Sequence, residues 1–184
     1  MALQEKNFRK DARENKEALI QAAMSAFSEN GSETPLNAIA KAAGVSRATF
    51  YRNFPDRSSI VAAVLSKNVS TLEQSAITLK NSDETFYKLI EYIVHQQVEF
   101  QALLSYLPKK EGIILEQRIL KLFEEPVQLA QESGKLRTDF DINNDLKLII
   151  NMLGGITISG DAQTRTIRAE RALCLIKEGL FKGN

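Results

Sequence analysis

Apolar residues recur along this chain every three or four positions, and short polar breaks separate the stretches in which they do so. In the first such stretch the apolar residues are Leu19, Ile20, Ala23, Met24 and Phe27. This spacing matches the α-helix, and no segment alternates apolar and polar residues strictly enough to indicate a strand. The pattern therefore predicts an all-α protein of about nine helices.

Capping and breaking residues set the expected ends of these helices. Residues 1–10 carry no apolar stripe and predict a loose arm, whereas Asp11 and Glu14 form an acidic variant of the capping box that starts the first helix. Asn30-Gly31 ends it. Further helices are expected over residues 57–80 after the Pro55-Asp56 cap, 84–106, 110–133 with a break at Pro126, 141–159 capped by Asp141, and 163–181.

Residues 36–54, LNAIAKAAGVSRATFYRNF, have the features of a helix-turn-helix. Ala40 is a small residue where two crossing helices approach each other, and Gly44 suits the positive φ of a tight turn. Val45 and Phe50 supply apolar packing from the turn and from the second helix. This combination is moderately specific for the motif.

Hydrogen-bond donors crowd the outer face of residues 46–53, and their density predicts DNA binding. The donors are Ser46, Arg47, Thr49, Tyr51, Arg52 and Asn53. Ser46 is expected to cap the second helix of the motif and to hold a phosphate. Arg47 is the expected bidentate reader of a guanine, Thr49 suits a phosphate or a thymine methyl, and Tyr51 suits a phosphate. The alternative is an ordinary polar helix surface, and the turn signature beside it favours DNA.

The segment IAKAAGVSRATFYRNF, between a capped first helix and a long fourth one, closely resembles the TetR family over residues 12–72. The resemblance implies a helix-turn-helix DNA-binding domain over 12–72, with its motif at 35–54, and a regulatory and dimerisation domain over 73–184. Pro35 replaces a frequent Ser or Thr, so Thr34 is the expected substitute for a phosphate contact, and Arg57 replaces a usual Lys that contacts phosphate. The expected DNA-binding residues are Thr34, Ser46, Arg47, Thr49, Tyr51, Asn53 and Arg57.

The last two expected helices suggest an interface. The segment NMLGGITISG carries three glycines, each of which costs a helix about 1 kcal/mol relative to alanine unless another helix must approach closely. The final helix has apolar faces formed by Leu173, Leu175, Ile176, Leu180 and Phe181. The resemblance implies that the two helices pair with their copies in a homodimer; the alternative is packing within one chain.

Evidence for a ligand cavity is thin at this level. The candidate lining residues are Phe86, Tyr87, Tyr92, His95, Phe100, Tyr106, Phe123 and Met152, and each of these is more often core, so none is assigned to a site. No charged cluster stands among them, which favours a small apolar or aromatic effector. His95 is expected to be a partly buried structural imidazole, and Cys174 a buried, inert thiol.

Composition narrows the function classes. The net charge is +1, with +2 on residues 1–57 and −1 on the rest, which is compatible with phosphate contact at the N-terminal end. One His, one Cys and the absence of catalytic or metal-ligand motifs argue against an enzyme, a cofactor or a metal site. No apolar run predicts a membrane span, and the cytoplasm is the expected location. The helix-turn-helix predicts a DNA-binding regulator, and the family resemblance implies a homodimer, more often a repressor, on a partly palindromic operator. The alternative is a helix-turn-helix scaffold that acts mainly through protein partners.

Overall fold

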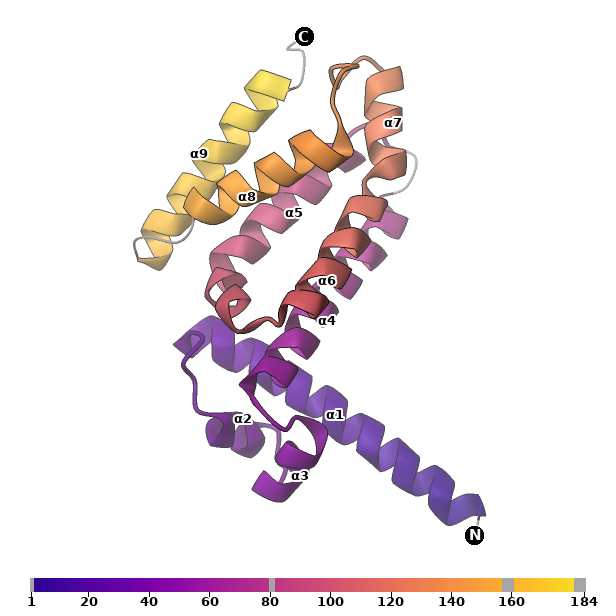
Figure 1. The fold of residues 1–184 in the computed structure, drawn as a ribbon, viewed down its shortest axis with the longest axis vertical. Coiled ribbons are helices and arrows are strands. Elements are labelled where there is room, and N and C mark those ends of the chain that lie inside the picture. The colour runs from indigo at the N-terminus through magenta and orange to yellow at the C-terminus, as the bar shows by residue number, and fades with distance from the viewer. Residues whose placement is uncertain (1, 80–81, 157–160, 181–184) are drawn as a thin grey trace. The chain divides into compact units, whose positions relative to one another are not determined.

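A computed structural model of the chain describes residues 2–79, 82–156 and 161–180 (Figure 1). Within these ranges the elements are α1 (Ala2–Asn30), α2 (Leu36–Ala42), α3 (Arg47–Asn53), α4 (Arg57–Thr78), α5 (Thr85–Phe100), η1 (Gln101–Tyr106), α6 (Lys109–Leu122), α7 (Glu124–Glu132), η2 (Ile142–Leu146), α8 (Lys147–Ile156) and α9 (Ala162–Leu180). Here η1 is a 3-10 segment and η2 a π-helical one. The described residues contain nine α-helices and no strand, which confirms the predicted all-α class. None of these helices has both the length and the apolar character needed to cross a bilayer.

The chain forms two compact units. The first comprises Met1–Lys67 with Ala102–Lys109, and the second comprises Asn68–Gln101 with Lys110–Asn184. Helix α4 therefore contributes its first half to one unit and its second half to the other. The boundary expected between residues 72 and 73 falls in the same helix and stays a prediction.

In the first unit, α1 packs on α2, and α2 packs on α3. Leu19, Ala23 and Phe27 of α1 are buried, at the helical spacing that the sequence predicts. The expected start of α1 at Asp11 is wrong, because the helix already begins at Ala2. Residues 2–10 are rich in strong helix formers such as Ala, Leu, Gln, Glu, Lys and Arg, so the helix extends there without an apolar stripe.

In the second unit, α5 is the central helix and packs against α7, α8 and α9 (Figure 1). Its buried face carries Phe86, whose ring lies edge-on to Phe123 at 5.7 Å and to Phe140 at 5.3 Å between ring centroids. Such edge-to-face pairs add about 0.5–1.5 kcal/mol beyond the burial of their area. Phe86 and Phe123 thus serve as core and do not line a cavity.

Two expected helix ends need correction. The helix expected over 84–106 is α-helical only to Phe100, and the tighter 3-10 segment η1 carries the chain on to Tyr106. The break expected at Pro126 lies instead at Phe123, between α6 and α7. Pro126 stands in the first turn of α7, where a helix needs no N–H, so proline is tolerated there.

The other signals behave as predicted. Gly134 has φ 73° and ends α7. The carboxylate of Asp141 accepts a hydrogen bond from the Asn144 N–H at 2.7 Å, although the element that it caps is the π segment η2, from which α8 continues.

His95 and Cys174 are both exposed, contrary to the expected buried imidazole and thiol. Each directly follows a buried residue of its helix, Val94 or Leu173. One residue turns an α-helix by about 100°, which is enough to carry the next side chain off the core face.

The glycines of α8 differ from one another. A Cβ on Gly154 would lie 3.3 Å from the Gln101 Oε1 atom, so this glycine makes room for a side-chain amide at the end of α5. Gly155 is exposed and faces open space. Gly160 lies outside the described residues.

Candidate nucleic-acid interface

The turn between α2 and α3 has the geometry that the sequence predicts. Gly44 has φ 69°, a conformation that L side chains rarely adopt, and its N–H donates to the Lys41 carbonyl at 3.1 Å. The Val45 N–H donates to the carbonyl of Ala40, which is buried where the two helices meet. This tight connection fixes the direction in which α3 leaves the turn.

The packing of Phe50 determines which face of α3 is presented to solvent. Phe50 is buried and its ring centroid lies 6.1 Å from that of Phe54, so this side of the helix belongs to the core. The exposed residues of α3 are Arg47, Ala48, Tyr51 and Arg52. Of the predicted donors, Ser46, Arg47, Tyr51 and Arg52 are therefore exposed, and Thr49 and Asn53 are partly exposed.

Ser46 caps α3, and a short hydrogen-bond chain follows from it. The Ser46 Oγ atom accepts from the Thr49 N–H at 3.1 Å and shares a hydrogen bond with the Thr49 Oγ1 atom at 3.0 Å. Arg52 donates to that same Oγ1 atom at 3.1 Å and to the Ala48 carbonyl at 3.3 Å. The Arg52 guanidinium is thereby held along its own helix.

Arg47 differs from Arg52 in its surroundings. Its guanidinium lies over the Tyr51 ring, 5.6 Å from the centroid, and has no hydrogen-bond partner among the described residues. A cation above an aromatic face is held by about 0.5–1 kcal/mol at an exposed site, which restricts its rotamers without using its N–H groups. Asn53 donates to the Thr49 carbonyl at 2.9 Å, which leaves its side-chain oxygen as an acceptor.

Asp56 fixes the start of α4, as the sequence predicts. Its carboxylate accepts from the Ser58 hydroxyl at 2.7 Å and from the Ser59 N–H at 2.8 Å. These two hydrogen bonds lower the pKa of Asp56 below its ordinary value. The charged cap is therefore stable at neutral pH.

Thr34 and Arg57, both expected at phosphates, are engaged inside the first unit. Thr34 is only 5% exposed, and its hydroxyl donates to the carbonyls of Gly31 at 2.8 Å and Ala26 at 3.0 Å. Arg57 donates to the carbonyls of Ser32 at 2.5 Å and Thr34 at 3.0 Å. These bonds engage the Thr34 hydroxyl and two of the five Arg57 N–H groups, and the phosphate contacts expected of both residues stay predictions.

One residue of this face was missed by the sequence reasoning, which searched for donors. Ala48 is exposed on α3 directly after Arg47. An alanine methyl suits contact with the methyl group of thymine. Its signal in the sequence is only its position between two predicted contacts.

Comparison with known proteins agrees with this geometry. Residues 19–64 match the family model described as "Bacterial regulatory proteins, tetR family". The HTH-type transcriptional regulator SAR2658 of Staphylococcus aureus (strain MRSA252) is 29% identical over 102 residues, which are 53% of this chain and 55% of that protein. The match thus spans about half the length of the relative.

Solved structures extend the likeness to nearly the whole chain. The TetR transcriptional regulator SCO0520 of Streptomyces coelicolor aligns with a TM-score of 0.68 and 25% identity, over 92% of this chain and 99% of its own. Residues 19–64 thus form a TetR-type DNA-binding domain, and the chain shares the fold of TetR regulators over nearly its whole length. A TetR regulatory protein of Mycobacterium vanbaalenii shares the fold with a TM-score of 0.70 and 24% identity over 95% and 99% of the two chains. RolR, solved in complex with resorcinol, shares it with a TM-score of 0.59 and 19% identity over 91% and 89%.

TetR proteins are DNA-binding transcription regulators and not enzymes, and this chain shares their N-terminal domain. The family model covers α2, α3 and the first part of α4, together with the part of α1 from Leu19 onward. The matched residues thus include the turn between α2 and α3 and the exposed face of α3 described above.

Proposed function

We propose that α3 reads the major groove, with Arg47 as the residue that selects the base. The supporting observation is that Arg47 keeps its five N–H donors available while Tyr51 restrains its position, whereas Arg52 is already engaged. A planar guanidinium matches the two acceptors of guanine, and such a bidentate contact discriminates by about 1–3 kcal/mol. Ser46, Thr49, Tyr51 and Asn53 position the helix on the backbone around it.

Selecting bound duplexes from a random-sequence pool supplies an operator for the test. On that operator Arg47→Ala is expected to bind about 5- to 150-fold more weakly and to lose preference at one base position. Arg47→Lys is the matched control, because it keeps the charge and loses the planar fork. It should recover nonspecific affinity but not the base preference. Unchanged affinity and selectivity in Arg47→Ala would remove Arg47 from this role, and failure to enrich any duplex would favour the alternative of a scaffold for protein partners.

The regulator acts as a homodimer through α8 and α9 in this proposal. Each helix turns large apolar side chains outward: Leu148 and Met152 on α8 are 58% and 59% exposed, and Ile167 and Leu175 on α9 are each 58% exposed. The two helices pack side by side, so these residues belong to one element pair (Figure 1). A second copy covering them would remove a sizeable apolar area from water.

This assignment changes the residues that were expected at the interface. Leu173 is 4% exposed and belongs to the core of the second unit, and Ile176 packs against that core. Leu175→Glu combined with Met152→Glu should therefore yield monomers in sedimentation, while Ile113→Glu, on an exposed apolar residue of α6, should leave the dimer intact. Cys174 is the only cysteine and is exposed beside Leu175, so a short bis-maleimide provides an independent measure of dimerisation. A wild-type chain that sediments as a monomer at micromolar concentration would falsify the homodimer.

A two-fold axis constrains the operator. Two copies of α3 related by this axis should meet major grooves about 34–36 Å apart, or somewhat more with a spacer. The selected duplexes should then contain a partial palindrome. We further propose that binding at such a site blocks transcription, as repressors do, and a promoter–reporter assay with and without the protein tests the sign.

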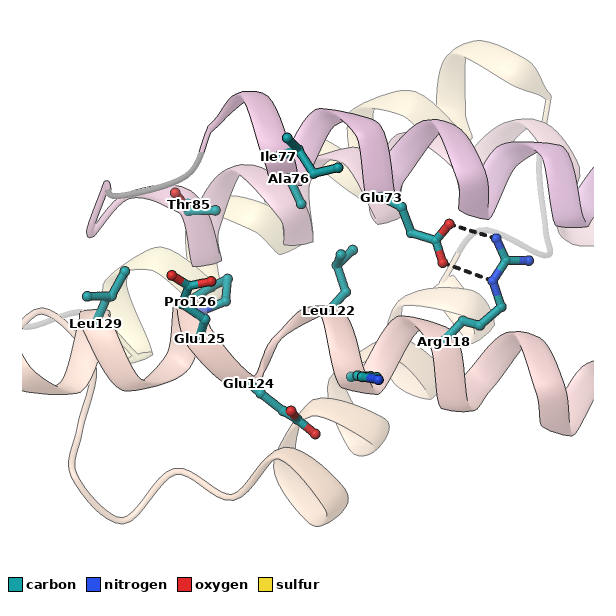
Figure 2. Close-up of a pocket in the computed structure, with 11 residues that line it drawn as sticks. Glu73, Ala76, Ile77, Thr85, Arg118, Leu122, Glu124, Glu125, Pro126 and Leu129 are labelled. Carbon is teal, nitrogen blue, oxygen red and sulfur yellow. Dashed lines mark hydrogen bonds and ion pairs between the residues drawn. The ribbon is translucent and has the colours of Figure 1, made fainter.

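A groove in the second unit offers a place for an effector. It has a volume of about 610 Å³ and lies between the second half of α4, the start of α5, and α6 with α7. Figure 2 shows its apolar wall and the ion pair that closes one end. The apolar wall consists of Ala76, Ile77, Leu122, Pro126 and Leu129. At the closed end Arg118 donates to both carboxylate oxygens of Glu73, at 2.9 and 2.8 Å.

This lining favours an amphipathic small molecule, with an apolar body and a polar end, over the predominantly apolar or aromatic effector that the sequence suggests. RolR shows that a protein of this fold was solved with a small aromatic compound. The groove borders α4, which continues into the first unit, so a ligand that prefers one placement of α4 would shift operator affinity by its differential affinity for the two states.

Thermal-shift screening of a broad library identifies candidate effectors. Ile77→Glu puts a charge on the apolar wall and should abolish the shifts of true groove ligands, whereas Ile113→Glu outside the groove should not. Reciprocity then requires operator DNA to weaken a ligand by the same factor by which the ligand weakens operator binding. Hits that leave operator affinity untouched would remove the switch and leave the DNA binder.

A further inference from the structure

Arg57 is the centre of a small cluster within the first unit. It stands at the first position of α4, and its two terminal nitrogens donate to the carbonyls of Ser32 and Thr34. Both carbonyls belong to the loop that joins α1 to α2. A single side chain thus ties the start of α4 to the loop that sets where the helix-turn-helix begins.

Tyr106 completes this cluster from a distant part of the sequence. The Arg57 guanidinium lies over the Tyr106 ring, 5.5 Å from the centroid, and the Tyr106 hydroxyl donates to the Glu33 carboxylate. That hydrogen bond raises the pKa of Tyr106 above its ordinary value. Glu33 is in the same loop as Ser32 and Thr34, so the loop is gripped through two backbone carbonyls and one side chain.

The position of Tyr106 in the sequence sets it apart from the other residues of the cluster. Residues 102–109 belong to the first unit, yet the chain on either side of them belongs to the second unit. Tyr106 is the last residue of η1, which continues directly from α5, the central helix of that second unit. The loop before α2 is therefore held by a residue whose place depends on the end of α5.

We propose that Arg57 and Tyr106 are positioning residues of the DNA-reading unit: Arg57 holds the loop of residues 31–35 instead of a phosphate, and Tyr106 holds Arg57 and Glu33 in place. The proposal rests on DNA reading by α3, because its effect on DNA is the placement of α2 and α3. It assigns residues 102–109 to the function of the first unit.

Salt dependence separates positioning from phosphate contact. Loss of one phosphate contact flattens the plot of log affinity against log salt by about 0.9. We expect Arg57→Gln and Arg57→Lys each to weaken binding of the selected operator about tenfold, the equivalent of one hydrogen bond to a charged group, without flattening the slope. Lysine keeps the charge but cannot reach two carbonyls with a planar fork. Wild-type affinity in Arg57→Lys together with a flattened slope in Arg57→Gln would make Arg57 a phosphate ligand and overturn the proposal.

Hydrogen exchange tests the role of Tyr106 without any DNA. Tyr106→Phe keeps the ring beneath Arg57 and loses only the hydroxyl, Tyr106→Leu loses both, and Glu33→Gln keeps an acceptor oxygen. Amide exchange over residues 31–38 should quicken most in Tyr106→Leu, less in Tyr106→Phe and least in Glu33→Gln, while α5 and α9 keep their protection.

Tyr87→Phe is the matched control, since Lys177 lies over the Tyr87 ring at 5.2 Å within the second unit. It should leave exchange over residues 31–38 unchanged. Wild-type exchange there in both Tyr106 variants would overturn the role of Tyr106. Quickened exchange in a chain that selects no duplex would instead leave the cluster standing and remove the DNA reading on which its function rests.

Discussion

The two units differ in how their functional surfaces are built. In the first, the exposed face of α3 consists of polar side chains tied to one another within a few residues, from Ser46 to Thr49 to Arg52. In the second, the candidate surfaces are apolar: Leu148 and Met152 come from α8, Ile167 and Leu175 from α9. A surface made by local hydrogen bonds is encoded in one short segment, whereas a surface left over after core packing depends on every helix beneath it.

The neighbours Leu173 and Leu175 give the largest contrast within the second unit. Leu173→Ala should lower the free energy of unfolding by about 2–5 kcal/mol, because it empties a buried site. Leu175→Ala should cost less than about 0.5 kcal/mol in the monomer and act through dimerisation. Urea denaturation at several protein concentrations distinguishes them, since only the Leu175 effect should vary with concentration. Equal, concentration-independent losses would contradict the outward assignment of Leu175.

Replacing one glycine of each unit by alanine should change the free energy of unfolding in opposite directions. Gly44→Ala forces a side chain to adopt φ 69° and should cost about 1–2 kcal/mol, although nothing crowds the new Cβ. Gly155→Ala, inside α8 with open space around it, should stabilise the monomer by up to about 1 kcal/mol. Thermal unfolding of both variants measures the pair. A stabilising Gly44→Ala would mean that the turn between α2 and α3 is not as tight as described.

The first unit was the more predictable because its signals are local. Gly44, the Ser46 cap and the Asp56 cap each act within four residues, and all three are confirmed. What the sequence could not reveal were partners far along the chain. Arg57 and Tyr106 are 49 positions apart, so nothing in the neighbourhood of Arg57 indicated that two of its N–H groups would meet backbone carbonyls beneath a tyrosine ring.

The same limit explains the errors in the second unit. Apolar runs on α9 showed that the helix packs, but choosing between Leu173 and Leu175 as the outward residue requires knowing where α5 and α8 lie against it. A proline inside a helical pattern predicts a break, as it does at Pro126. The break falls earlier because a new helix starts just before this proline. Burial of Cys174 was inferred from its apolar neighbours alone, and the helical turn places it outside.

Replacing a buried threonine in each unit should lower the free energy of unfolding by a smaller amount, which is the same in both units. Thr34 in the first unit and Thr85 in the second each donate to backbone carbonyls, Thr85 to that of Leu79 at 2.6 Å. Thr34→Val and Thr85→Val should each cost about 0.5–1.5 kcal/mol in urea denaturation, the net value of such hydrogen bonds. Neither should change the salt slope of operator binding. A flattened salt slope in Thr34→Val alone would show that Thr34 contacts a phosphate.

The smallest expected effect is the pH dependence of the Glu73–Arg118 pair. Arg118 lowers the pKa of Glu73 below its ordinary 4.5, so the pair stabilises the fold fully above that value. Its contribution is lost as the pH falls through the lowered pKa, because the carboxyl is then protonated. Both side chains are about a third exposed, so the contribution is at most about 1 kcal/mol. Glu73→Gln should flatten stability between neutral and acidic pH by that amount in urea denaturation at several pH values.

The π-helical segment η2 governs the angular phase of everything after it in α8. It delivers the chain so that Leu148 and Met152 point outward and Leu153 points into the core. Because each residue of an α-helix advances the direction of its side chain by about 100°, removing one residue from Ile142–Leu146 would rotate the whole apolar stripe by that angle. A change that alters no exposed side chain would thereby present a different face to a second copy. In the proposed homodimer, the orientation of the partner surface is encoded in the length of the segment that precedes it.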